Sequence, residues 1–95
     1  MTLYRLYTER RDLPVLEALV SGRFDGYTLY FTAGIWRGLR EMSVVVEILA
    51  DDSPDTVTKV RMLVADIRVS LNQQAVLWTV QPAVQATLET GEPGA

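Results

Sequence analysis

The chain has 95 residues, of which 48% are hydrophobic and 22% charged, a composition typical of one globular domain. Nine Lys and Arg against twelve Asp and Glu give a net charge of −3, so the basic surplus that drives nucleic-acid binding is absent. The sequence contains no Cys and no His, which excludes disulfides, cysteine and histidine metal ligands, and catalysis by a thiol or an imidazole.

The first quarter of the chain predicts a strand followed by a short helix. Residues 2–8 are rich in Thr, Tyr and Leu, and the segment is too short for a helix before the charged run that follows. Asp12 can cap a helix that has Pro14 in its first turn, and Gly22 can end it. We therefore expect a helix over about 13–21.

The middle of the chain predicts two strands joined by a hairpin. Residues 27–33 and 41–49 are rich in aromatic and β-branched side chains. Residues 34–40 lie between them and supply two glycines for the connection. The two strands should therefore pair antiparallel.

The last part of the chain predicts a second helix, a fourth strand and a tail. Ser53 as the cap and Pro54 as the first helical residue begin a helix that apolar spacing extends to about residue 72. Residues 75–80 are rich in β-forming side chains and predict a short strand. Residues 85–95 show no apolar period, so we expect a flexible tail after a single domain of residues 1–84.

This order of elements predicts an α+β, ferredoxin-like βαββαβ fold, with a four-stranded antiparallel sheet and two helices on one face. Right-handed crossovers place the first and third strands in the middle of the sheet. Arg5 should then face Glu47 across the two central strands.

The second face of the sheet has no helix to cover it. Alternation along the strands places an apolar set around the Arg5–Glu47 pair on this face: Leu3, Tyr7, Val45 and Leu49. Because an exposed apolar face usually has a partner, we expect a homo-oligomer that covers it. The alternative is that residues 82–89 fold back over this face as a fifth strand or a cover.

The compartment follows from what the sequence lacks. The N-terminal residues have no apolar signal-peptide core, and no stretch reaches the length of about 20 apolar residues that a membrane-spanning helix needs. We therefore expect a cytoplasmic protein without membrane contact.

Two stretches resemble a group of short bacterial and phage proteins. One reads GxWRGxxExSxVxEI over residues 34–48, and the other reads NQQAVL over residues 72–77, where Gln74 replaces a Glu of the group's pattern. Their layout is similar to that of the PII and CutA-like ferredoxin-fold proteins. The resemblance implies a homo-oligomer, a trimer rather than a dimer, that binds nucleotides or other small anions in clefts between subunits.

The candidate site centres on the hairpin end. Trp36 offers a surface on which an aromatic ring can stack, and Arg37 offers a fork of donors that suits a phosphate or a carboxylate. The alternative is that Trp36 packs under the hairpin and Arg37 is solvated. The predicted ligand-binding residues are Arg5, Tyr7, Trp36, Arg37 and Glu41. If the ligand is bound elsewhere, the amides of Gln73 and Gln74 are the next candidates.

No metal site, cofactor or catalytic residue is predicted. The acidic run at residues 51–55 is typical of a capped helix start, because the ligand pattern of a calcium loop is missing. Three functions remain open. The first, which we favour, is a non-catalytic oligomer that binds a nucleotide-like molecule or another small anion, as a sensor or a sequestering protein. The others are a small cofactor-free enzyme and a module that docks on another protein through the open sheet face.

Overall fold

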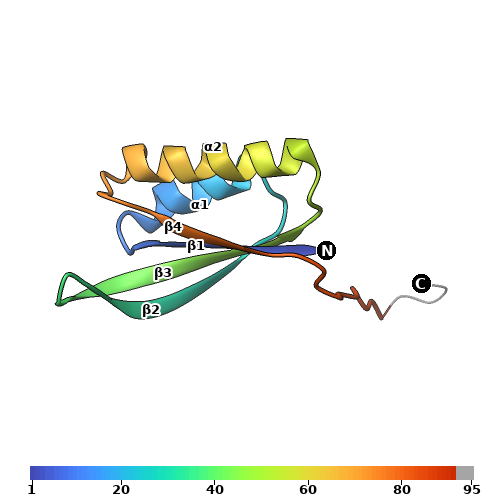
Figure 1. The fold of residues 1–95 in the computed structure, drawn as a ribbon, viewed down its shortest axis with the longest axis horizontal. Coiled ribbons are helices and arrows are strands. Elements are labelled where there is room, and N and C mark those ends of the chain that lie inside the picture. The colour runs from blue at the N-terminus through green and yellow to red at the C-terminus, as the bar shows by residue number, and fades with distance from the viewer. Residues whose placement is uncertain (92–95) are drawn as a thin grey trace.

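The computed structural model of the chain describes residues 1–91 and confirms the predicted order of elements. The strands and helices are β1 (Thr2–Glu9), α1 (Leu13–Ser21), β2 (Thr28–Trp36), β3 (Leu39–Ala50), α2 (Pro54–Ser70) and β4 (Leu77–Gln81). They form a ferredoxin-like α+β fold in which both helices cover one face of a four-stranded antiparallel sheet (Figure 1). The strand order is β2-β3-β1-β4, so β1 and β3 are the central strands, as predicted.

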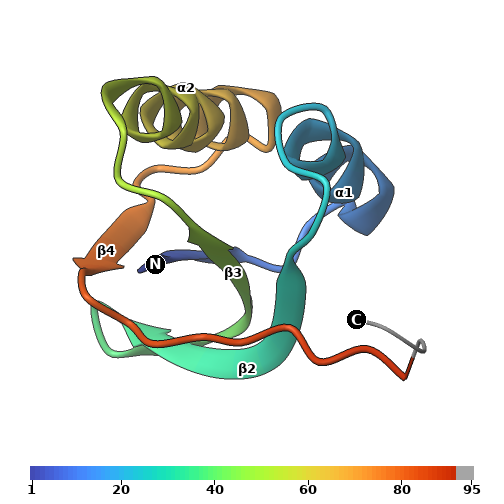
Figure 2. The ribbon, with the colours of Figure 1, turned by 90° about the vertical axis from the view of Figure 1, so that its right-hand side faces the viewer.

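The hydrophobic core lies between the sheet and the helices, which pack side by side on the same face (Figure 2). Every second residue of the central strands points into it, because strand side chains alternate between faces. Fully buried residues come from both layers: Tyr4, Leu6, Val44, Val46 and Ile48 from the sheet, and Leu16, Val20, Val60, Leu63 and Ile67 from the helices.

Both helices begin at the predicted caps. The Asp12 carboxylate accepts a hydrogen bond from the Val15 N–H at 3.4 Å, and the Ser53 hydroxyl accepts one from the Thr56 N–H at 3.2 Å. Each helix has a proline in its first turn, where the missing N–H leaves no bond unmade. Helix α2 ends at Ser70, two residues earlier than predicted, and Asn72 then takes a left-handed conformation that turns the chain toward β4.

The β2–β3 hairpin is longer than predicted, because most of residues 34–40 belong to the strands. Only Arg37 and Gly38 form the turn, with φ angles of 51° and 78°, as in a two-residue hairpin turn that needs positive φ at both positions. Gly34 lies within β2 instead. A Cβ atom there would stand 2.8 Å from the Ser43 hydroxyl, so this glycine allows a close approach to the neighbouring strand.

The C-terminal segment adds no fifth strand within the described residues. Residues 82–91 have no regular secondary structure, although the Val84 N–H donates a hydrogen bond to the Met1 carbonyl at 2.8 Å. Strand β4 begins at Leu77, two residues later than predicted. The last part of the predicted tail, residues 92–95, lies outside the described residues. Among residues 1–91, no helix has the length and apolar character needed to cross a membrane.

Candidate functional site

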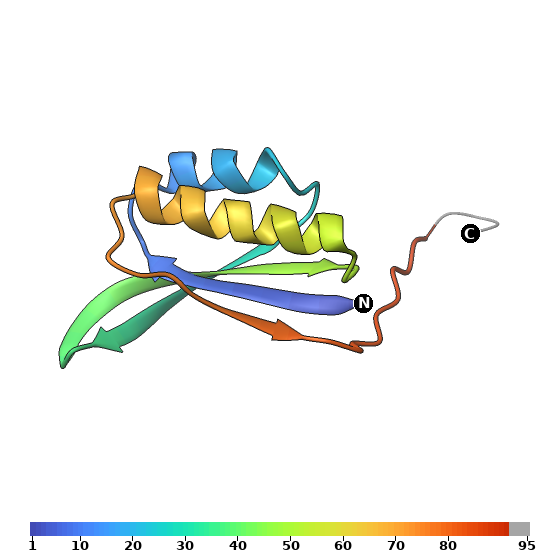
Figure 3. The same ribbon diagram turned by 45° about the horizontal axis from the view of Figure 1, so that its top comes forward.

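The hairpin formed by β2 and β3 extends past the ends of both helices (Figures 1 and 3). The exposure of residues along β3 shows where the helices stop covering the sheet. Val44 is fully buried beneath the helices, whereas Met42, two residues along the same face, is 58% exposed. The distal half of the hairpin therefore has no helix above it.

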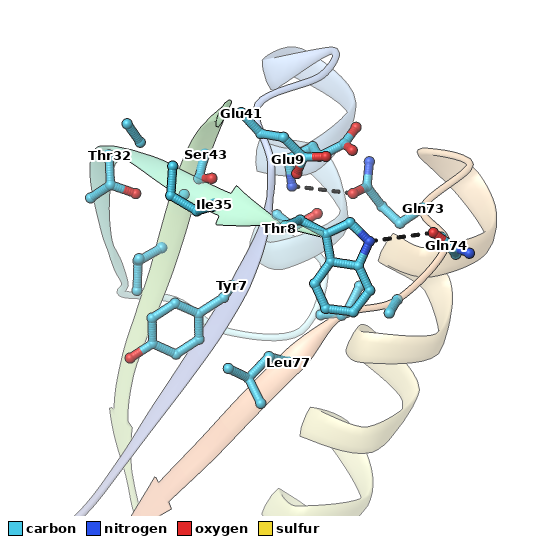
Figure 4. A pocket seen from close by; sticks show the side chains of 16 residues that line it. Tyr7, Thr8, Glu9, Thr32, Ile35, Glu41, Ser43, Gln73, Gln74 and Leu77 are labelled. Atoms are coloured by element: carbon cyan, nitrogen blue, oxygen red, sulfur yellow. Dashed lines mark hydrogen bonds between the residues drawn. The ribbon is translucent and has the colours of Figure 1, made fainter. Parts of the chain in front are cut away.

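A cavity of about 650 Å³ lies where the hairpin meets the end of β1 and the segment between α2 and β4 (Figure 4). These segments are far apart in the sequence and are brought together by the strand order. The lining comes from residues 7–9, residues 32–36, residues 73–77, Glu41, Ser43 and Val45. Most of this wall is apolar, with several polar groups among the apolar ones.

One side of the cavity is closed by a contact between the hairpin end and the segment after α2. The Trp36 indole N–H donates a hydrogen bond to the Gln74 amide oxygen at 3.4 Å (Figure 4). Trp36 remains 45% exposed and so does not pack into the core. The two features that the sequence singled out separately, the tryptophan hairpin and the glutamine pair, are thus neighbours.

The end of the cavity nearest α2 is held by Gln73, which is 7% exposed. Its amide oxygen accepts a hydrogen bond from the Glu9 N–H, and its amide nitrogen donates one to the Leu71 carbonyl, each at 3.2 Å. Gln73 therefore fastens the end of α2 to the end of β1. The role of its side chain is to fix the shape of the cavity.

Thr8 lines the same cavity and is only 4% exposed. Its hydroxyl has no hydrogen-bond partner within residues 1–91. Buried polar side chains are nearly always hydrogen bonded, because leaving one unpaired costs roughly 1–3 kcal/mol. The hydroxyl oxygen itself is buried, and the strand register turns Thr8 to the helix side with Val44, so this unpaired group lies behind the cavity wall and is not offered to a ligand.

Two carboxyl groups, Glu9 and Glu41, lie at one end of the cavity (Figure 4). Burial raises the pKa of the Glu41 carboxyl, and the negative charge and hydrogen bonding of Glu9 raise it further. Arg11 opposes this shift and forms an ion pair with Glu9. This end of the cavity is therefore acidic.

The structure brings three of the five predicted site residues to the cavity. Tyr7, Trp36 and Glu41 line it, whereas Arg5 and Arg37 do not. The Arg5 guanidinium instead pairs with the Glu47 carboxylate across the central strands at 3.0 Å, as the strand alternation predicted. That hydrogen bond is the main reason why the pKa of Arg5 is raised.

Arg37 lies in the turn of the hairpin and contacts the ring of Trp36. Its guanidinium carbon is 5.5 Å from the centre of the Trp36 ring, within the range of a cation–π contact. Its left-handed backbone conformation forms part of the tight turn between β2 and β3. Among residues 1–91, no Lys or Arg lines the cavity, so the expected cationic clamp for an anion does not form there.

The comparison with known proteins finds similarity in structure alone. No protein-family model and no curated protein matches this chain. A phage SAM lyase in complex with S-methyl-5′-thioadenosine aligns over 84% of this chain and 79% of its own, with a TM-score of 0.66 and 17% identity. A DUF3240 family protein from Shewanella baltica OS155 aligns over 94% of this chain and 96% of its own, with a TM-score of 0.61 and 11% identity. These similarities establish the ferredoxin-like fold.

Proposed function

We propose that this chain is a non-catalytic, small-molecule-binding protein whose ligand occupies the cavity beside the hairpin. The cavity itself carries the proposal. Its volume of about 650 Å³ falls within the range of roughly 300–1,000 Å³ that is usual for small-molecule sites. Its wall is mainly apolar and contains a few convergent polar groups, which is the composition of such sites. A protein that senses or sequesters a small molecule needs such a cavity and no catalytic group.

The groups in the wall favour a nucleoside-like ligand that is uncharged or cationic. Trp36 and Tyr7 offer aromatic surface for a base, and the Gln74 amide lies beside Trp36 in the wall. Glu9 is paired with Arg11, whereas Glu41 has no ion-pair partner within residues 1–91 and would repel a phosphate and attract a donor group. We therefore still expect a ligand with a base and a sugar, and we no longer expect a phosphate on it.

The phage lyase suggests the first compound to test. That protein holds S-methyl-5′-thioadenosine, a nucleoside that carries no phosphate. The same compound would suit a cavity with aromatic surface, amide groups and an acidic end. We therefore take it, together with adenosine and adenosine 5′-monophosphate, as a series in which only the group at the 5′ position changes.

The test is calorimetric titration of the wild-type chain with these three compounds. We expect S-methyl-5′-thioadenosine and adenosine to bind, and the monophosphate to bind at least tenfold more weakly. Trp36→Ala and Tyr7→Ala should each weaken binding at least tenfold, which corresponds to about 1.4 kcal/mol. Arg61→Ala, on the exposed side of α2, is the control and should keep full affinity.

Two results would overturn this proposal. Equal affinity for adenosine and its monophosphate would mean that the acidic end of the cavity does not select the ligand. Full affinity in both Trp36→Ala and Tyr7→Ala would place the ligand outside the cavity. Melting curves of each variant show that a loss of binding is not a loss of folding.

The Glu9–Glu41 pair favours a second candidate function, a small cofactor-free enzyme. A carboxyl group with a raised pKa in a cavity can hold or accept a proton during a reaction. The lyase activity of the phage protein gives one reaction to try. Incubation with S-adenosylmethionine, followed by chromatography for S-methyl-5′-thioadenosine, would detect it. Product formed by wild type and lost in Glu41→Gln would replace the binding proposal with an enzymatic one.

A further inference from the structure

Strand β2 is an edge of the sheet, and its outer side has no neighbouring strand. The strand order gives β2 only β3 as a partner. Within residues 1–91, residues 28–36 form no backbone hydrogen bond outside the ladder with β3. The outer row of N–H and C=O groups along these nine residues is therefore unpaired. Such a row is complementary to the backbone of another extended chain.

The two edges of the sheet differ in how well they are protected. Strand β4, the other edge, has only five residues and is followed by Pro82, which has no N–H to donate. Strand β2 has nine residues, none of them charged or proline, and seven of the nine are exposed. Natural edge strands usually avoid strand addition by being short or by carrying charges or proline. Because β2 has none of these features, it is the edge that is open to an added strand.

The side chains of β2 offer apolar contacts to an added strand. Phe31 and Ile35 are 56% and 71% exposed. The register pairs Phe31 with the core residue Val44, so both lie on the helix side of the sheet, where the helices no longer cover it. A strand beside β2 would lie about 4.8 Å away and would cover these two side chains with apolar residues of its own.

A positive charge lies beside these apolar side chains. The Arg10 side chain reaches from the end of β1 to β2, where its guanidinium carbon is 4.7 Å from the centre of the Phe31 ring. Arg10 forms no ion pair within residues 1–91, and its Nε atom is buried without a hydrogen-bond partner there. Arg40 is opposite Ile35 in the register and also forms no ion pair within this range. The helix side of β2 is therefore bordered by two cations.

The carboxylates of neighbouring segments do not neutralise these cations. They are engaged by other groups or lie on the other side of the sheet: Glu9 pairs with Arg11, Asp12 accepts the Val15 N–H at the start of α1, and Glu41 lines the cavity. A carboxylate on an added strand, opposite Phe31, would meet Arg10 directly.

A second copy of β2 is a poor occupant of this edge. Antiparallel pairing of the whole strand with itself is centred on Thr32, which makes the Phe31 residues of the two copies diagonal neighbours, roughly 7–8 Å apart. Each Phe31 carries an Arg10 guanidinium, so two cations without carboxylate partners would meet on one face. A strand that brings a carboxylate to this position replaces that repulsion with attraction, and charge complementarity selects partners in this way.

We infer that β2 is a docking edge for an extended segment of another protein, which carries acidic and apolar side chains and adds a fifth strand to the sheet. The backbone of this segment pairs with residues 28–36, as in other cases of strand addition. Its apolar side chains cover Phe31 and Ile35, and its carboxylate pairs with Arg10. The interaction requires no small molecule in the cavity.

The probe for this edge is a fluorescein-labelled peptide with the sequence Val-Thr-Val-Thr-Glu-Thr-Val-Thr-Val. The sequence reads the same in both directions, so in a parallel or an antiparallel pairing Glu can lie opposite Phe31 with a valine opposite Ile35. Fluorescence polarisation should show saturable binding to the wild-type chain. The same peptide with Lys in place of Glu should bind at least tenfold more weakly, and about 0.5 M NaCl should remove most of that difference by screening the charges.

Matched variants and hydrogen exchange locate the bound peptide. Ile35→Glu on β2 should weaken binding of the Glu peptide at least tenfold, whereas Val80→Glu on β4 should keep full affinity. Both residues are exposed, at 71% and 50%, so each variant should fold. Arg10→Gln should remove most of the preference for the Glu peptide over the Lys peptide. Amide hydrogen exchange of the wild type should slow on peptide binding in residues 28–36 and not in residues 77–81.

The inference is wrong if the Glu peptide does not bind, if the Glu and Lys peptides bind equally well, or if the exchange of residues 28–36 does not change. It is also wrong if the wild type is dimeric by light scattering and residues 28–36 are already protected without peptide, because a second copy would then occupy the edge. If Ile35→Glu fails to fold by circular dichroism, the exchange data on the wild type still locate the peptide. No nucleoside is added, so the result is independent of the proposed ligand.

Discussion

The two halves of β3 differ in what covers them, although the strand and its alternation are continuous. In the half beneath the helices, Val44, Val46 and Ile48 are fully buried. In the half beyond them, Met42 on the same face is 58% exposed. The pattern of side chains is the same in both halves, so the reach of α1 and α2 decides whether an apolar strand residue is buried in the core or stays exposed at the surface.

This difference separates the core from the candidate site along the long axis of the molecule. The covered half contains the helix–sheet core, whereas the hairpin half contains the cavity and exposed apolar residues such as Phe31 and Met42. Substitutions of buried residues in the covered half should therefore destabilise the chain, while exposed apolar residues of the hairpin should be replaceable with little loss of stability. The predictions below test this division, starting from the largest expected effect.

Leu63→Ala should lower the free energy of unfolding by about 2–5 kcal/mol, the usual range for truncating a buried leucine. The matched change Phe31→Ala, at a residue that is 56% exposed, should cost less than about 1 kcal/mol. Urea unfolding, at a concentration where light scattering shows monomers, measures both. Equal losses for the two variants would contradict the division.

The exception within the hairpin should be Gly34, because the Ser43 side chain of the neighbouring strand occupies the space next to it. Gly34→Ala should cost about 1 kcal/mol, at the low end for overpacking, because its new Cβ would stand 2.8 Å from the Ser43 hydroxyl. Adding Ser43→Ala removes that oxygen and should recover most of the lost free energy of unfolding. A double variant as unstable as Gly34→Ala alone would show that the crowding at this oxygen is not the cause.

Ser53→Ala tests the covered half at its edge, where the cap of α2 is half-buried. Loss of the hydrogen bond to the Thr56 N–H should cost about 1 kcal/mol, the usual value for an N-cap. Arg61→Ala, later on the same helix, is the control and should be close to neutral. A loss as large as that of Leu63→Ala would mean that the cap supports much more than the first turn of the helix.

The sequence predicted the features of the fold that depend on neighbouring residues or on strand alternation. The caps at Asp12 and Ser53 follow from local hydrogen-bonding chemistry, and the Arg5–Glu47 pair follows from the order of the strands. The turn was placed too broadly, because two glycines in one segment do not reveal which has a positive φ. Only Gly38 does, while Gly34 relieves crowding with the next strand.

The candidate site was predictable only in part, because it is made of segments far apart in the sequence. The sequence proposed Trp36 and Gln74 as separate candidates, and their contact spans 38 residues. The unpaired hydroxyl of Thr8 left no signal at all, since whether a threonine finds a partner depends on the packing around it. The exposed Met42 also could not be foreseen, because the sequence does not fix how far the helices reach over the hairpin.

The smallest expected effect concerns the pH dependence that Glu41 contributes. Because the pKa of Glu41 is raised in the folded chain, the folded state binds this proton more tightly than the unfolded state does. The contribution of Glu41 to stability is therefore fully present below its usual pKa of 4.5 and is lost as the pH rises through the raised value. Glu41→Gln cannot lose a proton, so it should melt at the same temperature as wild type in acid and at a slightly higher temperature at pH 7.

Melting curves of wild type and Glu41→Gln across this pH range measure the effect, with Glu17→Gln on the exposed side of α1 as a control for the loss of a surface charge. In a Glu9→Gln background, the difference in melting temperature that Glu41→Gln causes should be smaller. Glu9 supplies both the charge and the hydrogen bond that reinforce the rise in the Glu41 pKa. A Glu41→Gln variant that melts below wild type at pH 7 would have the wrong sign, and would mean that Glu41 is stabilised as the carboxylate. In that case the acidic end of the cavity would already be neutralised by the protein, and it would no longer favour an uncharged or cationic ligand over an anion.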